Sequence, residues 1–294
     1  MATPNSTIYD PVLVTDLIDK TKGHSTLAKL SGQSPMPFNG IKEFTFTMDK
    51  EMDIVAENGA KSEGGFSMAP LTVVPIKFEY GARVSDEFVY ASEEARINYL
   101  KAFNEGFAKK MGRALDIAAF LGLNPRTGTA SAVVGNNCFD KAIADADAVT
   151  FDADTADENV EAAIAKLAED TDVNGLAVNP AFRAALAAIK KTDGNKLFPE
   201  LAWGGKPAVL GGLQFDVNST ISYNSSDLRA VVGDFKNAFK WGIAKEIPLE
   251  VIPYGDPDNS GQDLKGHNQV YLRAEVYMGW CILDPTAFAK VIAE

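Results

Sequence analysis

The chain has 294 residues, of which 46% are hydrophobic, so it is long enough to bury one large core or two modest ones. Its formal net charge is −12, whereas a protein that binds nucleic acid needs excess Lys and Arg to neutralise phosphates. These numbers exclude a disordered chain and argue against a nucleic-acid-binding protein, and no apolar run approaches the length of a membrane span.

Motifs that carry catalytic chemistry are scarce. Only two histidines occur, His24 and His267, and the two cysteines, Cys138 and Cys281, have no metal-ligand spacing. The nearest approach to a phosphate loop, WGGKPAV, has proline where a metal-binding hydroxyl should follow the lysine. We interpret acidic runs such as DADAVTFDADTADE as solvated loops and helix caps, with a weak calcium site as the alternative. The sequence therefore predicts no enzyme, no cofactor and no metal.

An irregular N-terminal arm over residues 1–40, with a short helix at DPVLVTDLIDKTKG, is expected to lead into a long hairpin over 41–85. Residues 41–57 alternate through Phe44, Phe46 and Met48, and a return strand is expected from Leu71 to about Val84. The polar, glycine-rich tip lies between them. A two-stranded ribbon is marginal in water, so we expect its missing partner on another chain.

Residues 86–122 are expected to contain one long amphipathic helix. It should start after Ser92 and end at Gly122, which makes a rod about 45 Å long. The apolar residues recur at steps of three and four along it: Ile97, Leu100, Phe103, Phe107, Met111, Leu115, Ala118 and Leu121.

An inserted α/β domain is expected over residues 123–265. A helix begins in capping-box spacing at Thr155, a short apolar run follows, and a second helix has Asn179 as its cap, Pro180 at its first position and Gly194 as its stop. Strand-like pieces come next: LQFDVNSTI, LRAVVGDF, AFKWGIA and LEVIPY.

The last segment, residues 266–294, contains a strand of unusual length. Its alternation spans about 50 Å, roughly three times an ordinary strand. One face is apolar and should pack on the stripe of the long helix, and it consists of Val270, Leu272, Ala274, Val276, Met278, Trp280 and Ile282. The opposite face is polar and consists of Gln269, Tyr271, Arg273, Glu275 and Tyr277.

Four stretches carry a resemblance to a known family: DIVAENGAKSE, VNPAFRAALAAIKKTDG, VVGDFKNAFKWGIAKEIPLEV and NQVYLRAEVYMGWCILDPTAFAKV. In this order they resemble the Hong Kong 97-type major capsid proteins of tailed bacteriophages. The resemblance implies an α+β fold whose parts are the N-terminal arm (1–40), the long hairpin or E-loop (41–85), a peripheral domain with a spine helix (86–122), an inserted α/β axial domain (123–265), and the long strand and C-terminus of the peripheral domain (266–294).

The function that the resemblance implies is assembly into pentamers and hexamers that form an icosahedral shell around double-stranded phage DNA. The protein would reside in the virion capsid after assembly in the host bacterial cytoplasm. Its partners would be other copies of itself, a portal, a maturation protease and DNA bound without sequence specificity. It would not bind a membrane. A separate scaffolding protein is expected because no long helical segment precedes the arm, and the alternative is that the chain is already a processed form. The alternatives are an encapsulin nanocompartment shell enclosing cargo enzymes and a soluble α/β enzyme with an unrecognised site.

Two sets of site residues follow from the resemblance. Phe198, Leu201 and Trp203 would lie in a loop at the capsomer axis, and the alternative is that they fold back into their own domain.

The second set, Lys61, Asn268 and Glu275, matches the positions of an isopeptide cross-link between subunits. Because Asn268 and Glu275 are seven apart, they face opposite ways in a regular strand, so the bond would need several chains. The residues themselves favour the alternative that Lys61 is solvated and Glu275 pairs with Arg273 on the same face.

Overall fold

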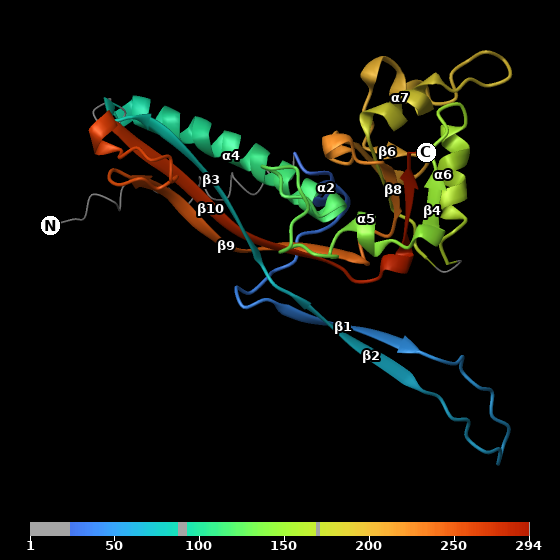
Figure 1. Ribbon diagram of the computed structural model, residues 1–294. Helices are drawn as coiled ribbons and strands as arrows, with labels where there is room; N and C mark the ends of the chain where they lie inside the picture. The colour runs from blue at the N-terminus through green and yellow to red at the C-terminus, as the bar shows by residue number, and fades with distance from the viewer. Residues whose placement is uncertain (1–23, 88–92, 169–170, 294) are drawn as a thin grey trace.

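The computed structural model describes residues 24–87, 93–168 and 171–293. Figure 1 shows a long helix beside a narrow three-stranded sheet, a six-stranded sheet with short helices at one end, and a hairpin that projects from the body. The helix expected at residues 10–23 and the helix start expected at Ser92 lie outside the described residues. Within them, there is no helix with the length and apolar character needed to cross a membrane.

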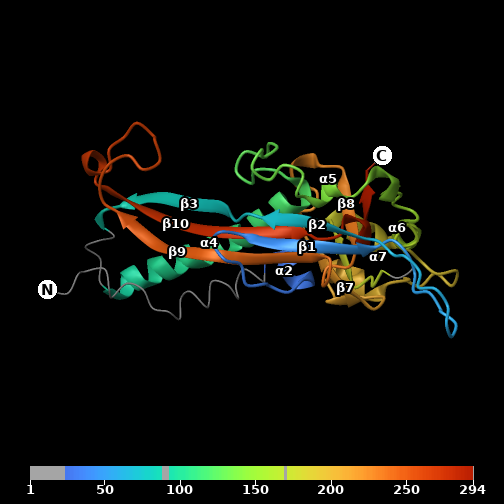
Figure 2. The same ribbon diagram turned by 90° about the horizontal axis from the view of Figure 1, so that it is seen from below.

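The three-stranded sheet is antiparallel and has the long strand at its centre. Its order is β3 (Ile76–Ser85), β10 (Gln269–Ile282) and β9 (Phe239–Ile252). Figure 2 shows the three strands side by side with the long helix behind them. The alternation in the sequence therefore predicted the long strand correctly, because a period of two is a local property of the chain.

The long helix is α4 (Glu93–Leu121), whose 29 residues make a rod about 43 Å long. It ends where the sequence predicts, because Gly122 takes a φ of +67° that suits glycine at the end of a helix. The apolar stripe of α4 and the even-numbered face of β10 belong to one buried core, in which Met111, Leu115, Val276 and Met278 are fully covered. The predicted packing of helix on strand is confirmed.

The odd-numbered face of β10 is more covered than the alternation suggests. Tyr271 and Glu275 are buried on it. Near the end of β10 the N-terminal segment 33–38 crosses this side of the sheet, and the ring of Phe38 lies 5.0 Å from that of Tyr277. At this end of β10 the odd-numbered face is therefore an internal surface, whereas Glu275 is enclosed with Lys77 and Arg273, its neighbours on the sheet.

The six-stranded sheet is mixed. Its order is β4 (Ala148–Thr150), β11 (Phe288–Ile292), β8 (Leu228–Gly233), β5 (Gly175–Val178), β7 (Leu213–Val217) and β6 (Val209–Leu210). The pairs β11–β4 and β5–β7 are parallel and the others are antiparallel. Helices α6 (Ala156–Ile164) and α7 (Pro180–Ala188) contribute buried residues to its core.

The predicted helix, strand, helix order is present here, with two differences at the helix ends. Asn179 caps α7 as predicted and accepts a hydrogen bond of 2.7 Å from the Phe182 amide, whereas the Thr155 side chain makes no capping bond to α6. Helix α7 ends at Ala188 instead of running to Gly194. The chain turns extended at Ile189, whose carbonyl accepts from Leu197, so Gly194 lies in the loop between them.

Two strands join sheets other than those expected. The pieces AFKWGIA and LEVIPY form one strand, β9, which pairs with β10 through two register shifts instead of belonging to the inserted domain. The C-terminal β11 joins the six-stranded sheet instead of staying with the long strand. Four of the five residues of β11 are buried, which requires neighbours on both sides.

The hairpin is also shorter than expected. Its strands are β1 (Ile41–Met48) and β2 (Phe66–Val73), and the expected return strand from Leu71 to Val84 is wrong. Residues from Ile76 onward form β3, which pairs with β10. Pro75 separates the two strands because it has no amide hydrogen to continue a ladder.

Within the described ranges the other helical segments are short. The α-helical ones are α2 (Thr26–Leu30) and α5 (Phe139–Ala142), and the 3-10 turns are η1 (Asp145–Asp147), η2 (Pro199–Gly204), η3 (Tyr223–Ser225), η4 (Lys265–His267) and η5 (Pro285–Ala287). Helix α5 places Phe139 where the two sheets meet. Its ring lies 4.9 to 5.7 Å from four others, those of Phe120, Phe235, Phe239 and Phe288.

Candidate assembly surfaces

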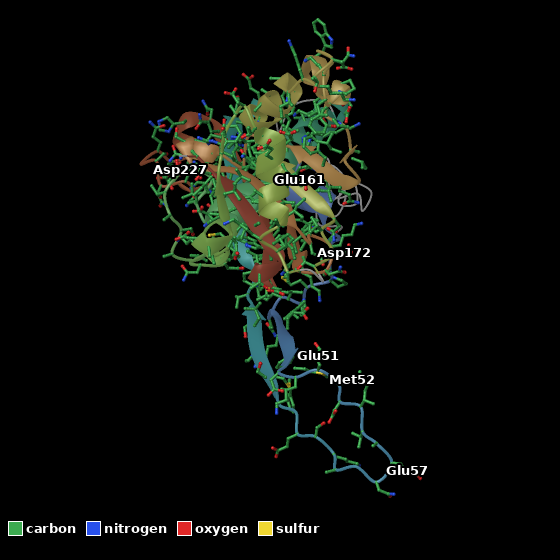
Figure 3. All side chains as sticks on the ribbon, turned by 90° about the vertical axis from the view of Figure 1, so that its right-hand side faces the viewer. Glu51, Met52, Glu57, Glu161, Asp172 and Asp227 are labelled. Carbon is green, nitrogen blue, oxygen red and sulfur yellow. The ribbon has the colours of Figure 1, made fainter. Side chains whose placement is uncertain are left out.

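The hairpin exposes several large apolar side chains in the single chain. Figure 3 shows its tip, marked by Glu51, Met52 and Glu57, hanging away from the body. Met52 and Ile54 are 97% exposed, and further exposed apolar residues lie on the strands: Phe44, Met48, Phe66 and Met68. Exposed apolar residues gathered on one arm are typical of a surface that binds another protein.

The tip, residues 49–65, is also acidic, with five Asp or Glu residues and two lysines. Its ends are held together by polar contacts: the Gly65 amide donates to the Asp49 carboxylate at 2.7 Å, and the Lys50 ammonium donates to the Glu63 carbonyl at 3.0 Å. Lys61 lies in the exposed tip, as expected for a solvated residue. Apolar residues on an acidic loop would suit a partner surface that is apolar with a basic rim.

The three residues expected at the capsomer axis separate into two groups. Leu201 is 0% exposed, and Phe198 packs partly buried against the same core. The Arg183 guanidinium donates to the Leu201 carbonyl at 3.2 Å and ties the turn η2 to α7. Trp203, in contrast, is fully exposed and has a φ of +57°. The first two fold back into their own domain, and Trp203 stands out from it.

The cross-link residues do not meet within one chain. Figure 1 shows the hairpin tip and the start of β10, where Asn268 lies, at opposite ends of the molecule. Asn268 precedes the strand in a left-handed conformation, so the face argument from strand parity does not apply to it. Glu275 is 7% exposed and is paired with Lys77 at 2.8 Å and with Arg273 at 3.4 Å. The predicted Arg273 pair is therefore present, together with a closer lysine.

A buried carboxylate that the sequence did not single out fixes the N-terminal segment to the long helix. Asp116 of α4 is fully buried and accepts hydrogen bonds from the Ser25 hydroxyl at 2.6 Å and from the amides of Thr26 and Leu27 at 2.8 and 3.2 Å. Helix α2 thus begins directly on this carboxylate.

The same carboxylate reaches the six-stranded part. Asn218 and Thr220, which follow β7, donate to Asp116 at 3.1 and 3.2 Å. Nearby, Asp216 of β7 pairs with Lys29 of α2 at 2.7 Å. Burial raises the pKa of Asp116 from 3.8 to about 6, although the donors lower it. One side chain therefore joins three segments that are far apart in the sequence.

With this geometry established, comparison with known proteins identifies the family. The phage capsid family matches residues 7–292. The chain belongs to the phage capsid family. Among solved structures the chain is similar to one described as Mycobacterium phage Ogopogo, with 32% identity, a TM-score of 0.78 and 92% of each chain covered. No curated protein matches it.

More distant structures share the fold. One from Gordonia phage Cozz has 22% identity and a TM-score of 0.75 and covers 92% of this chain and 87% of its own. Another, described as the capsid of an empty GTA particle, has 16% identity and a TM-score of 0.65 and covers 92% and 90%. The capsid protein has the mixed α+β fold of Hong Kong 97-type capsids, as the resemblance implied. It is a major capsid protein, a structural component of the icosahedral shell of a tailed phage, and not an enzyme.

Proposed function

We propose that this capsid protein forms pentamers and hexamers, which close into a shell around double-stranded phage DNA. The observation that carries the proposal is the hairpin, whose apolar residues are exposed in the single chain. A second copy of the chain would supply the cover that the ribbon lacks. The acidic balance of the chain suits a wall that holds packaged DNA without binding it tightly.

We propose that the domain boundaries of the subunit follow its two larger sheets, each of which belongs to one domain. The long helix and the three-stranded sheet would form the peripheral domain, and the hairpin would be the E-loop. The six-stranded sheet would form the axial domain. Compared with the division expected from the sequence, β9 moves to the peripheral domain and β11 to the axial domain, because strands in one sheet share a core.

The hairpin proposal is tested by removing its apolar side chains. Met52→Ser combined with Ile54→Ser should leave a folded subunit, because both side chains are exposed, but should prevent closed shells. Circular dichroism would report folding, and negative-stain microscopy with sedimentation would report assembly. The matched control is Ser62→Ala in the same tip. Normal shells from the double variant would contradict the proposal.

Trp203 is proposed to contact a neighbouring copy near the capsomer axis. Its full exposure predicts that Trp203→Ala changes the stability of the subunit by less than about 0.5 kcal/mol while reducing capsomer formation. The control is Leu201→Ala, which removes a buried side chain and should cost about 2 to 5 kcal/mol. Thermal melting and size-exclusion chromatography separate the two effects. Unchanged capsomers from Trp203→Ala would place the contact elsewhere.

The contents of the particle distinguish a virus shell from an encapsulin. Purified particles should contain nuclease-protected double-stranded DNA, and particles filled with an enzyme instead would support the encapsulin alternative. Assembly in the host cytoplasm would further involve a separate scaffolding protein, a portal and a maturation protease, and all three would be recovered with assembly intermediates.

A covalent cross-link between subunits through Lys61, Asn268 and Glu275 is a separate proposal. It requires three chains to converge and Glu275 to leave its lysine partner, because that carboxylate is already paired with Lys77 at 2.8 Å. The chemistry would be attack of a neutral Lys61 amine on the Asn268 carboxamide with loss of ammonia, assisted by the Glu275 carboxylate. The existing contacts of Glu275 favour a shell held without this bond.

A further inference from the structure

The loop that joins β9 to β10 has the residue spacing of a calcium-binding loop. In calcium loops of the EF-hand type, side chains at the first, third and fifth positions and a backbone carbonyl at the seventh bind the ion, and glycine at the sixth makes the turn. Here those positions are Asp256, Asp258, Ser260 and Gln262, with Gly261 at a φ of +80°.

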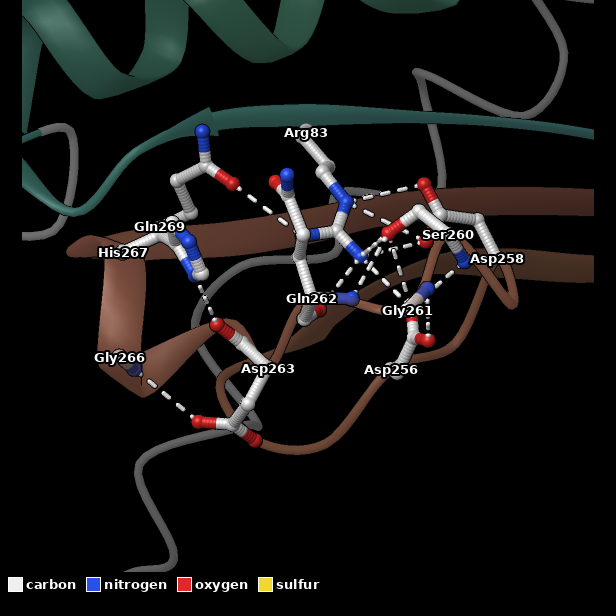
Figure 4. Close-up of polar contacts among 10 residues, drawn as sticks. All are labelled: Arg83, Asp256, Asp258, Ser260, Gly261, Gln262, Asp263, Gly266, His267 and Gln269. Atoms are coloured by element: carbon white, nitrogen blue, oxygen red, sulfur yellow. Dashed lines mark hydrogen bonds and ion pairs between the residues drawn. The ribbon is translucent and has the colours of Figure 1, made fainter.

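The four oxygens converge on an arginine from another strand, as Figure 4 shows. One terminal nitrogen of Arg83, Nη2, lies 2.7 Å from Asp256 Oδ1, 2.5 Å from Asp258 Oδ1, 2.5 Å from Ser260 Oγ and 2.8 Å from the Gln262 carbonyl oxygen. That nitrogen carries two hydrogens, so it cannot donate a separate hydrogen bond to each of the four oxygens. The oxygens surround the nitrogen in the way that ligands surround a cation.

The rest of the guanidinium holds this nitrogen in position. Arg83 Nε donates to Asp258 Oδ2 at 2.9 Å, and Nη1 donates to the side-chain oxygen of Gln269 at 3.3 Å. The Arg83 side chain is 15% exposed, and it comes from β3, 173 residues before Asp256. The arginine is therefore anchored by its strand and by both ends of the loop.

We propose that Arg83 is the resident cation of a calcium-type loop, with Nη2 at the metal position, so that the loop is closed without metal. His267 stands at the twelfth position, where calcium loops have a bidentate glutamate, so an ion would find fewer ligands than usual. A tethered guanidinium cannot diffuse away. The end of the three-stranded sheet is thereby kept in one conformation, whatever the calcium concentration during assembly.

The test is hydrogen exchange of the loop amides in the full-length subunit, with EDTA or with millimolar calcium chloride. The wild-type loop should exchange equally slowly in both. In Arg83→Gln the loop should exchange about tenfold faster in EDTA, because the cation is lost, and calcium should restore slow exchange. Magnesium should not, because it demands a stricter octahedral site.

Two controls make the outcome specific. Arg83→Lys keeps the positive charge but loses the Nε and Nη1 contacts, so in EDTA its loop should exchange more slowly than in Arg83→Gln and faster than in the wild type. Asp258→Asn added to Arg83→Gln should abolish the rescue by calcium. If Arg83→Gln is insoluble, refolding from urea with calcium or with EDTA gives the same discrimination. The proposal is overturned if the Arg83→Gln loop exchanges slowly in EDTA, if calcium fails to restore it, or if the wild-type loop itself requires calcium.

Discussion

At the scale of single residues, Asp116 is notable because its carboxylate is buried among hydrogen-bond donors. It is a carboxylate without exposure to solvent, and it accepts five hydrogen bonds from two other parts of the chain, residues 25–27 and 218–220. Desolvation, the largest effect, raises its pKa, and the donor from Ser25 and the two backbone amides lower it. The result, about 6, means that the group changes its charge within an accessible pH range.

The sign of the pH dependence follows from that shift. A pKa higher in the folded than in the unfolded chain means that the folded state binds more protons between about pH 3.8 and 6. The stability from this group is therefore fully present below pH 3.8 and is lost as the pH rises through 6, by about 3 kcal/mol.

Urea unfolding of free subunits from pH 4 to pH 7 measures this contribution as the difference between wild type and Asp116→Asn. The comparison is needed because Asp234 and Asp258 have lowered pKa values and act in the opposite direction. Asn cannot titrate, so the wild type should lose stability relative to the variant as the pH rises. A constant difference across this range would contradict the assignment.

At the scale of elements, close backbone approach over the sheet depends on glycine. A Cβ added to Gly242 of β9 would lie 2.2 Å from the Ser34 carbonyl oxygen, and one added to Gly279 of β10 would lie 2.5 Å from Met36 Sδ. The segment 33–38 therefore lies over the sheet because these two positions lack side chains.

Two glycine to alanine changes should have opposite effects. Gly242→Ala must push the Ser34 backbone away and should destabilise the subunit by about 1 to 3 kcal/mol. Gly106→Ala, in α4, meets no atom within 4 Å and should stabilise it by about 0.5 to 1 kcal/mol. Thermal unfolding of both variants measures the pair. A stable Gly242→Ala subunit would show that the segment over the sheet is displaced at little cost.

Elements with a local pattern were predictable, and their pairing was not. The apolar stripe of α4 and the alternation of β10 are patterns of neighbouring residues within one segment, so both were predicted from the sequence. The pairing of β3 with β10 and the transfer of β11 to the second sheet depend on partners far along the chain. Alternation indicates a strand but does not specify its neighbours.

At the scale of the whole molecule, the order of the parts and the family were predictable, whereas the polar clusters were not. Asp116 is followed by apolar residues in one helix, and its partners lie about 90 to 104 positions away. The spacing from Asp256 to Gly261 was a signal in the sequence, but nothing indicated that Arg83 would fill it. Exposure of Trp203 and burial of Leu201, two residues apart, likewise depend on the folded loop.

The covalent state of the shell is also a property of the whole assembly. Because Glu275 is paired with Lys77 and Arg273, mature particles boiled in detergent should give a single band at the 31.5 kDa monomer on a denaturing gel. A ladder of larger bands that disappears in Lys61→Ala would instead establish the cross-link.

The ring contacts of Phe139 determine how this subunit can move. Rotating one sheet against the other would separate this ring from Phe235 and Phe288 on one side and from Phe239 on the other. Each contact contributes about 0.5 to 1.5 kcal/mol beyond the area it buries, and a packed aromatic cluster has no intermediate position of low energy. The joint between the sheets is therefore not a hinge. We expect a shell that changes its curvature to bend at the contacts between chains or at the base of the hairpin.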